Sequence, residues 1–161
     1  NTYLTNSRTR NAAQTFKAGL MKAQAEAIRI NDRVEFVTTS ASPPAFNSAF
    51  NVNGKNWVVV RENPTPRSAL NNLVESRDAS EGSTTQVTQT TVGLTATPLT
   101  FNALGGTNQT GPVFFDLHPP GATCAAGSSV RCMGVLVSPS GRIHLCVNDP
   151  SLPVTDRRSC N

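Results

Sequence analysis

The stretch from residue 7 to about residue 31 constrains the fold most, because its apolar residues recur at alternating steps of three and four. This spacing places them on one face of an α-helix, which we expect over residues 7–31. The face expected to pack against the rest of the protein consists of Ala13, Phe16, Leu20, Ala23, Ala27 and Ile30. Half of these residues are alanine, so the helix backbone can lie close to a flat surface.

The outer side of the same helix is predicted to be basic. Residues 1–33 hold six Lys/Arg and two Asp/Glu, whereas residues 34–161 hold eight of each, so the net charge of +4 belongs to the helix. A basic face on one helix is usually solvated, and it is weak evidence for a nucleic-acid partner.

After Asn31 and Asp32 the pattern changes to short β-rich runs separated by Pro, Gly, Asn and Ser, which is typical of strands joined by turns. About seven strands are predicted, at residues 34–38, 57–61, 86–94, 99–103, 113–117, 133–137 and 142–147. Residues 40–56 and 63–83 are expected to be long connections. The pattern predicts an α+β fold, a single domain over residues 1–161 with its β-rich part at about 34–147.

All four cysteines lie near the C-terminus, at Cys124, Cys132, Cys146 and Cys160. They lack the close CxxC pairs of zinc ribbons, so their spacing favours disulfides over a metal site. Of the three possible connectivities, pairing 124 with 132 and 146 with 160 requires the least loop closure. We expect this local pairing, with a disulfide-closed loop at about 146–160. Disulfides also indicate export to an oxidising compartment.

Motifs for catalysis are not apparent in the sequence. His118 precedes two prolines and His144 falls inside a predicted strand, and neither accompanies a nucleophile-elbow pattern. Asp116 and His118 are expected on one face of a strand, as a surface pair. Phosphate-loop, dinucleotide and EF-hand spacings are also missing. We therefore expect no enzyme activity, no cofactor, no metal and no small-molecule substrate.

Residues 7–36, SRTRNAAQTFKAGLMKAQAEAIRINDRVEF, resemble the opening of minor pilins of the FimT/FimU/GspH group. The family pattern is Arg-x-x-x-Ala-Ala followed by Glu-Ala-Ile-x-x-Asn-x-x-Val. Arg8, Ala12 and Ala13 match its first part, and Gln24 stands where the family more often has arginine. Its second part is matched by Glu26, Ala27, Ile28, Asn31 and Val34. Trp57-Val58-Val59, LTFNALGG at 99–106 and VLVSPSGRIHLC at 135–146 resemble later strands of the family in the same order.

The resemblance implies a pilin-like fold, in which the amphipathic helix continues an upstream apolar helix half and a leader that the present sequence does not contain. That upstream half would anchor the protein in the inner membrane of a Gram-negative bacterium, facing the periplasm, before assembly into a pilus at the cell surface. The implied partners are other major and minor pilins. The implied function is a structural, initiating or tip subunit of a type IV pilus.

Two alternatives follow from the same resemblance. FimT-type members bind DNA during natural transformation through a GRxR element, and this chain has Gly141-Arg142-Ile143-His144 in its place. Arg142 and His144 are therefore candidate DNA-binding residues, although a neutral imidazole is a poor substitute for arginine at a phosphate. Arg157 and Arg158, in the second disulfide loop, are candidates to supply the missing charge. The other alternative is a pseudopilin of the type II secretion system, as GspH is.

Overall fold

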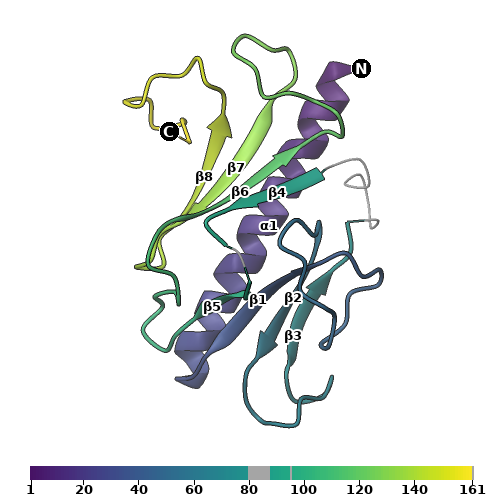
Figure 1. The fold of residues 1–161 in the computed structure, drawn as a ribbon, viewed down its shortest axis with the longest axis vertical. Helices are drawn as coiled ribbons and strands as arrows, with labels where there is room; N and C mark the ends of the chain where they lie inside the picture. Colours follow the sequence, from purple (N-terminus) through teal and green to yellow (C-terminus); the bar gives the residue numbers. More distant parts are fainter. Residues whose placement is uncertain (80–87, 95, 161) are drawn as a thin grey trace.

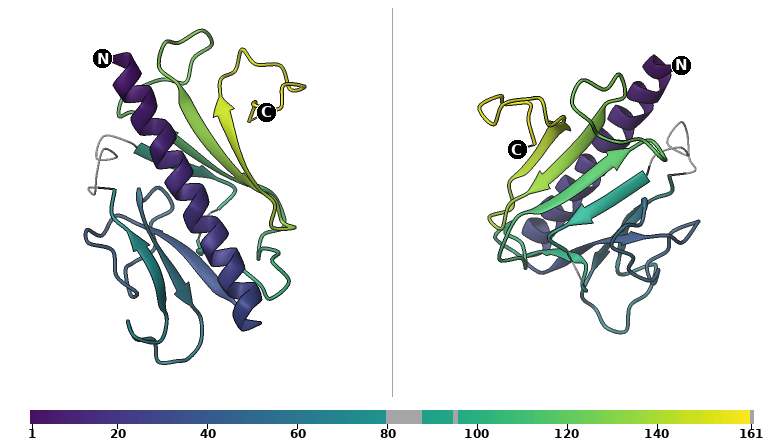
Figure 2. Two further views of the ribbon diagram at one scale, coloured as in Figure 1. Left: turned by 180° about the vertical axis from the view of Figure 1, so that it is seen from behind. Right: turned by 45° about the horizontal axis from the view of Figure 1, so that its top comes forward.

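One long helix lies across two antiparallel sheets in the computed structural model, which describes residues 1–79, 88–94 and 96–160 (Figures 1 and 2). Helix α1 spans Thr2–Ile30. The first sheet has the strand order β3-β2-β1-β5 and the second has the order β4-β6-β7-β8. The strands are β1 (Val34–Thr39), β2 (Asn56–Arg61), β3 (Leu73–Arg77), β4 (Thr88–Val92), β5 (Leu99–Phe101), β6 (Val113–His118), β7 (Cys132–Val137) and β8 (Ile143–Asn148). The predicted α+β class is confirmed.

Helix α1 begins five residues earlier than the sequence pattern predicts. Its first turns carry the exposed Tyr3 and Leu4, which do not extend the buried stripe and so gave no periodic signal. The helix ends where the pattern predicts, because Asn31 adopts a left-handed conformation (φ 54°) and its backbone N–H donates to Ile28 at 3.3 Å. Asparagine tolerates this conformation better than most residues, and it turns the chain into β1.

The predicted packing face of the helix lies against both sheets. Ala13, Leu20, Ala23 and Ala27 are completely buried, and Ile30 is half-buried against the same core. The buried face also includes Thr9, Ala12, Gly19 and Glu26. These four residues do not continue the apolar pattern, because two are polar, one is glycine and one lies beside the stripe.

Phe16 joins the two sheets in the centre of the core. Its ring lies 5.1 Å from the ring of Phe36 on β1 and 5.0 Å from that of Phe115 on β6. Phe36 in turn lies 5.3 Å from Trp57 on β2. Tilted and edge-to-face aromatic pairs at these separations stabilise a core beyond the area that they bury. Phe16 of the helix thus contacts an aromatic ring of each sheet, and the rings of Phe36 and Phe115 lie 6.2 Å from each other.

Gly19 lets the helix approach β2 closely. A Cβ atom added there would lie 2.6 Å from the ring of Trp57, well inside van der Waals contact. The indole ring of Trp57 occupies the space that a side chain at position 19 would need. Glycine is therefore required here for packing and not for its backbone conformation.

The structure has eight strands in its described part, one more than the sequence indicated. Strand β3 falls inside the stretch 63–83, which we predicted to be a connection. Only Leu73 and Val74 of this strand are apolar, and its last three residues are exposed at the edge of the sheet. Its register with β2, with a bulge between Val59 and Val60, is set by backbone pairing that composition does not reveal.

Five of the predicted strands agree with the observed ones within one residue at each end, and two differ by more. Strand β5 ends at Phe101 rather than at 103, because the side-chain oxygen of Asn102 accepts hydrogen bonds from the N–H groups of Leu104 and Gly106 and starts a turn. The strand predicted at 86–94 is observed as Thr88–Val92, and its residues 86 and 87 lie outside the described part.

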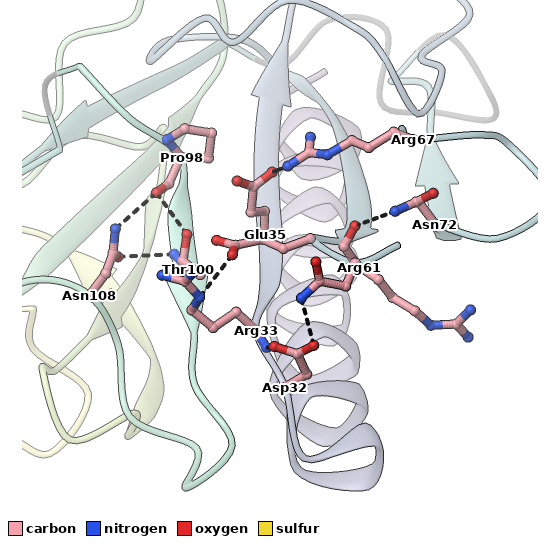
Figure 3. Close-up of polar contacts among 11 residues, drawn as sticks. Asp32, Arg33, Glu35, Arg61, Arg67, Asn72, Pro98, Thr100 and Asn108 are labelled. Carbon is pink, nitrogen blue, oxygen red and sulfur yellow. Dashed lines mark hydrogen bonds and ion pairs between the residues drawn. The ribbon is translucent and has the colours of Figure 1, made fainter. Parts of the chain in front are cut away.

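Polar side chains fasten the loops of the first sheet (Figure 3). The buried Asn72 donates to the backbone oxygens of Arg61 and Pro64, both at 2.9 Å. At the other edge Asn108 accepts from the N–H of Thr100 at 3.0 Å, which covers part of the free edge of β5.

Glu26 makes one ion pair within the helix, with Arg29, and one to β2, with Arg61. Its carboxylate accepts from Arg29 at 2.6 Å and from Arg61 at 2.8 Å, and its side chain is 8% exposed. The hydrogen bond from Arg29 and that from Arg61 outweigh desolvation and lower the pKa of Glu26 from 4.5 to about 2. The ionised form is therefore favoured by the fold.

We expect Glu26→Gln to lower the free energy of unfolding at pH 7 by about 2 kcal/mol. This is less than the full pKa shift would give, because solvent around the exposed Arg29 weakens the Glu26–Arg29 pair. Because the folded pKa is depressed, this contribution is present above pH 4.5 and is lost as the pH falls towards 2. Denaturant unfolding of both proteins across that range measures it. Glu75→Gln, at an exposed position of β3, is the control. A difference between wild type and Glu26→Gln that does not change with pH would contradict the linkage.

Candidate interaction surfaces

The turn between β7 and β8 carries the GRIH element, and it is held against the helix. Gln24 on α1 donates from Nε2 to the backbone oxygens of Gly105 at 2.8 Å and of Gly141 at 2.7 Å. A single amide thus joins the helix to the loop after β5 and to the β7–β8 turn. Gln24 stood out in the sequence only as a departure from the family pattern, and its position gives it this structural task.

Gly141 is required at this turn for two reasons. Its φ of +89° is in the region that favours glycine, and a Cβ atom there would lie 1.8 Å from the backbone oxygen of Gly105. The two glycine loops are therefore in direct backbone contact beneath the side chain of Gln24.

Arg142 follows this turn and is exposed. Its backbone is fixed, since its N–H donates to Ser138 Oγ at 3.1 Å and its carbonyl accepts from the N–H of Ser138 at 3.0 Å. Its guanidinium makes no ion pair or hydrogen bond with the residues that the structure describes. A positioned backbone with an uncommitted cation is suited to binding an external anion. His144 lies two residues further on, in β8 opposite Leu136, and is half-buried.

The other two candidate residues lie at the opposite end of β8. The carbonyl of Arg158 accepts from the N–H of Val147 at 2.6 Å. Five residue steps along a strand separate Val147 from Arg142, or roughly 16 Å. The four candidate DNA-binding residues therefore do not form one cluster: Arg142 and His144 lie at one end of β8, and Arg158 lies at the other. Strand geometry keeps them apart.

Arg158 is also already paired. Its guanidinium contacts the carboxylate of Asp156 at 2.7 Å. This hydrogen-bonded pair raises the pKa of Arg158 and lowers that of Asp156 to about 2. Arg157 beside it is exposed.

Both disulfides have the local pairing, Cys124 with Cys132 and Cys146 with Cys160. The second is seated on Gly134 of β7, where a Cβ atom would lie 2.6 Å from Cys160 Sγ and 2.3 Å from the ring of Phe114. The chain segment before Cys160 pairs with β8 through a short bridge between Val147 and Ser159. The C-terminal loop is thus held to the sheet by backbone as well as sulfur.

The disulfide loops lie at the end of the molecule where α1 begins (Figures 1 and 2). Asn6 of the helix holds the first loop, donating to the backbone oxygen of Ser129 at 3.0 Å and accepting from the N–H of Arg131 at 2.8 Å. The GRIH turn lies at the other end of the second sheet, beside Gln24 of the helix (Figure 1). The sequence order of these elements, only a few residues apart, gave no hint of this separation.

The exposed side of α1 carries a second apolar stripe, which we call the outer stripe: Ala18, Met21, Ala25 and Ile28. Met21 is 51% exposed and Ile28 is 53% exposed. A Cβ atom on Gly105 would lie 3.2 Å from Ile28 Cδ1, so the loop with the 93% exposed Leu104 adjoins this stripe. The helix therefore presents apolar as well as basic residues to the outside. Their steps of three, four and three give this stripe the same helical periodicity as the buried face.

Asp116 and His118 share the face of the second sheet that is turned away from α1, as predicted for residues two apart in a strand. His118 Nδ1 lies 3.4 Å from Asp116 Oδ2, and Cys124 Sγ lies 3.8 Å from the same oxygen.

None of the helices in the described residues is long and apolar enough to span a membrane.

Solved structures of other proteins share this fold. The type IV minor pilin FimU of Pseudomonas aeruginosa matches with a TM-score of 0.62 at 18% identity, over 86% of this chain and 88% of FimU. The minor pseudopilin EpsH from the type 2 secretion system of Vibrio cholerae matches with a TM-score of 0.53 at 13% identity, over 90% of this chain and 99% of EpsH. GspH of E. coli matches with a TM-score of 0.53 at 14% identity, over 92% and 94%. No curated protein sequence matches the chain.

The helix packed across two antiparallel sheets is the fold that this chain shares with the minor pilin FimU and the minor pseudopilin EpsH. The family described as Type II transport protein GspH matches residues 12–141, and the chain belongs to that family. The predicted membership of the FimT/FimU/GspH group is confirmed.

Proposed function

We propose that this protein is a minor pilin, a structural, initiating or tip subunit of a type IV pilus, which assembles through its N-terminal helix. The observation that carries the proposal is the outer stripe. A row of half-exposed apolar side chains on one helix face is stabilised when another subunit covers it. Small and large residues alternate along the row, as in Ala18-Met21 and Ala25-Ile28, a relief that a second helix can fit closely.

The likeness to FimU supports a pilus subunit over a secretion subunit. FimU is a type IV minor pilin and has the higher TM-score, 0.62 against 0.53 for EpsH. The alternative, a pseudopilin of the type II secretion system, is supported by the family and by EpsH and GspH. In either case the protein is proposed to act without catalysis, with other pilins as partners and an upstream helix in the inner membrane. Before assembly it would face the periplasm, and afterwards it would lie in a filament at the surface.

We expect Met21→Glu to abolish assembly while leaving the isolated domain folded. Met21 is half-exposed, so glutamate is tolerated in the monomer, but a carboxylate buried unpaired between subunits costs several kcal/mol. Incorporation should therefore fall by more than about tenfold. Surface pili are counted by electron microscopy after complementation of a deletion strain. Asn11→Glu, exposed on the same helix about two turns before the outer stripe, should restore normal numbers. Normal pili combined with a loss of secretion would favour the pseudopilin instead.

DNA binding in transformation is a second candidate function, favoured by the uncommitted guanidinium of Arg142. That side chain stands exposed at a turn whose backbone is held by Ser138. With Arg158 paired to Asp156 at the far end of β8, the site offers one strong phosphate contact rather than several. Binding through this turn would be weak and would depend on salt.

We expect Arg142→Ala to reduce the dependence of log affinity on log salt by about one, since one phosphate contact is lost. His144→Arg should strengthen DNA binding, because it restores the GRxR spacing of two arginines. Arg157→Ala, at the other end of β8, should change neither the DNA affinity nor its dependence on salt. Fluorescence anisotropy with a labelled duplex at several salt concentrations measures all three. No binding by wild type or His144→Arg at low salt would eliminate this function.

A further inference from the structure

Four potential metal ligands meet where β6 ends and β7 begins. Asp116 and His118 lie on the outer face of β6, and Leu117 between them pairs with Met133. Continuing that register places His118 opposite Cys132, the first residue of β7, where cross-strand Cβ atoms are about 5 Å apart. The disulfide brings Cys124 to the same point.

The ligand atoms are close enough for a common ion. The nearest potential donor atoms of Asp116, His118 and Cys124 all lie within 4.8 Å of one another. Cys132 Sγ is bonded to Cys124 Sγ at 2.05 Å. Tetrahedral zinc with bonds of about 2.0–2.3 Å needs neighbouring ligand atoms roughly 3.3–3.8 Å apart. The distances of 3.4 Å from His118 to Asp116 and of 3.8 Å from Cys124 to Asp116 already fall in that range.

His118 supplies a second, independent sign of a ligand. Its Nδ1 atom is buried and, although it lies 3.4 Å from Asp116 Oδ2, makes no hydrogen bond with the residues that the structure describes. Buried polar atoms are rarely left in this state, because each unpaired one costs free energy. The Asp116 carboxylate is in turn oriented by Asn148, whose Nδ2 donates to Oδ1 at 3.1 Å and leaves Oδ2 directed at His118 and Cys124. Such an outer partner is typical of metal-binding carboxylates.

We propose that the dithiol form of Cys124 and Cys132 binds one Zn²⁺ together with Asp116 and His118. Two thiolates, one imidazole and one carboxylate are a ligand set that suits tetrahedral zinc. In the disulfide form the two sulfurs are too close together to act as separate ligands. Zinc and the disulfide are thus alternative ways of closing the same loop, one before oxidation and one after it.

The disulfide and zinc-bound forms of Cys124 and Cys132 interconvert with electrons and protons conserved. A dithiol reductant gives two electrons and two protons to the Cys124–Cys132 bond, which becomes two thiols while the reductant becomes a disulfide. Zinc binding then releases both thiol protons to solvent. Oxidation reverses the sequence and expels the ion. Cys146 and Cys160 are bonded to each other, and neither belongs to the group of donor atoms that lie within 4.8 Å of one another.

The test uses the whole chain with Cys146→Ser and Cys160→Ser, so that only one disulfide is reduced, and a phosphine as reductant because it leaves no competing dithiol. Zinc alone is added, and binding is followed by competition with a chromophoric chelator. Cobalt(II) replaces zinc in a parallel titration to report geometry. Circular dichroism checks that each variant is folded. The matched control has Cys124→Ser and Cys132→Ser and keeps the other cysteine pair.

We expect one zinc ion per reduced chain, a tetrahedral cobalt spectrum with thiolate charge transfer, and no binding to the oxidised chain or to the control. Asp116→Asn and His118→Gln should each weaken zinc binding by at least roughly tenfold. Equal binding by both cysteine pairs, or unchanged affinity in Asp116→Asn and His118→Gln, would show adventitious binding by thiols and overturn the proposal. Failure of the reduced, folded chain to bind zinc would overturn it as well.

Discussion

Replacing Gly141 with alanine is expected to lower the free energy of unfolding by about 3 kcal/mol or more. A left-handed conformation forced on alanine costs on the order of 1 kcal/mol. The added Cβ atom would also lie 1.8 Å from the backbone oxygen of Gly105, so one loop must move and the two hydrogen bonds of Gln24 are strained. Overpacking of this kind costs about 1–3 kcal/mol by itself. Denaturant unfolding measures the total.

Gly121 provides a matched control for the conformational part of this effect. Its φ is +71°, and a Cβ atom there would meet nothing within 4 Å. Gly121→Ala should therefore cost only about 1 kcal/mol. If the two alanine variants are equally stable, the contact between the Gly105 and Gly141 loops is not what makes glycine necessary at the GRIH turn.

Replacing Phe16 with alanine is expected to cost about 3–5 kcal/mol, because it leaves a cavity between the two sheets. The ring is 2% exposed and is the one through which Phe36 of the first sheet and Phe115 of the second sheet both contact the helix. With most stabilities in the range of 5–15 kcal/mol, such a loss leaves the domain marginal. The midpoint of urea unfolding reports it.

Met21→Ala, on the opposite side of the same helix, is the control for Phe16→Ala. It removes a large apolar side chain at a position that is 51% exposed, where alanine is also a good helix former. The change in stability should stay within about 0.5 kcal/mol. An equal loss in both variants would mean that the stability of the helix, and not the packing between the sheets, is being measured.

These two pairs of variants also separate folding from assembly. Phe16 and Gly141 act inside the monomer, whereas the outer stripe and Arg142 are exposed and contribute little to its stability. A variant of the second group that loses pili or DNA binding while keeping its unfolding midpoint has therefore lost an interaction. A variant of Phe16 or Gly141 that loses pili or DNA binding could owe the loss to unfolding alone.

The sequence by itself determined the elements whose signal is local. Alternating steps of three and four identified the buried face of α1 and its end at Asn31, and the spacing of the cysteines favoured the two pairs that the structure contains. Both are short-range properties: a helix face repeats within a few residues, and a disulfide closes most readily over a short loop. The resemblance to minor pilins rested on the same helix motif and on three short later segments, at 57–59, 99–106 and 135–146.

Only the tertiary structure decided what depends on residues far apart in the chain. Strand β3 exists because its backbone pairs with β2, and its polar sequence did not reveal it. Gln24 joins two glycine loops that lie 81 and 117 residues away. The length of β8 places Arg142 and Arg158 at opposite ends, and pairing between β6 and β7 gathers Asp116, His118 and two cysteines at one point. Sequence periodicity describes one element at a time, whereas these arrangements are set by register and packing between elements.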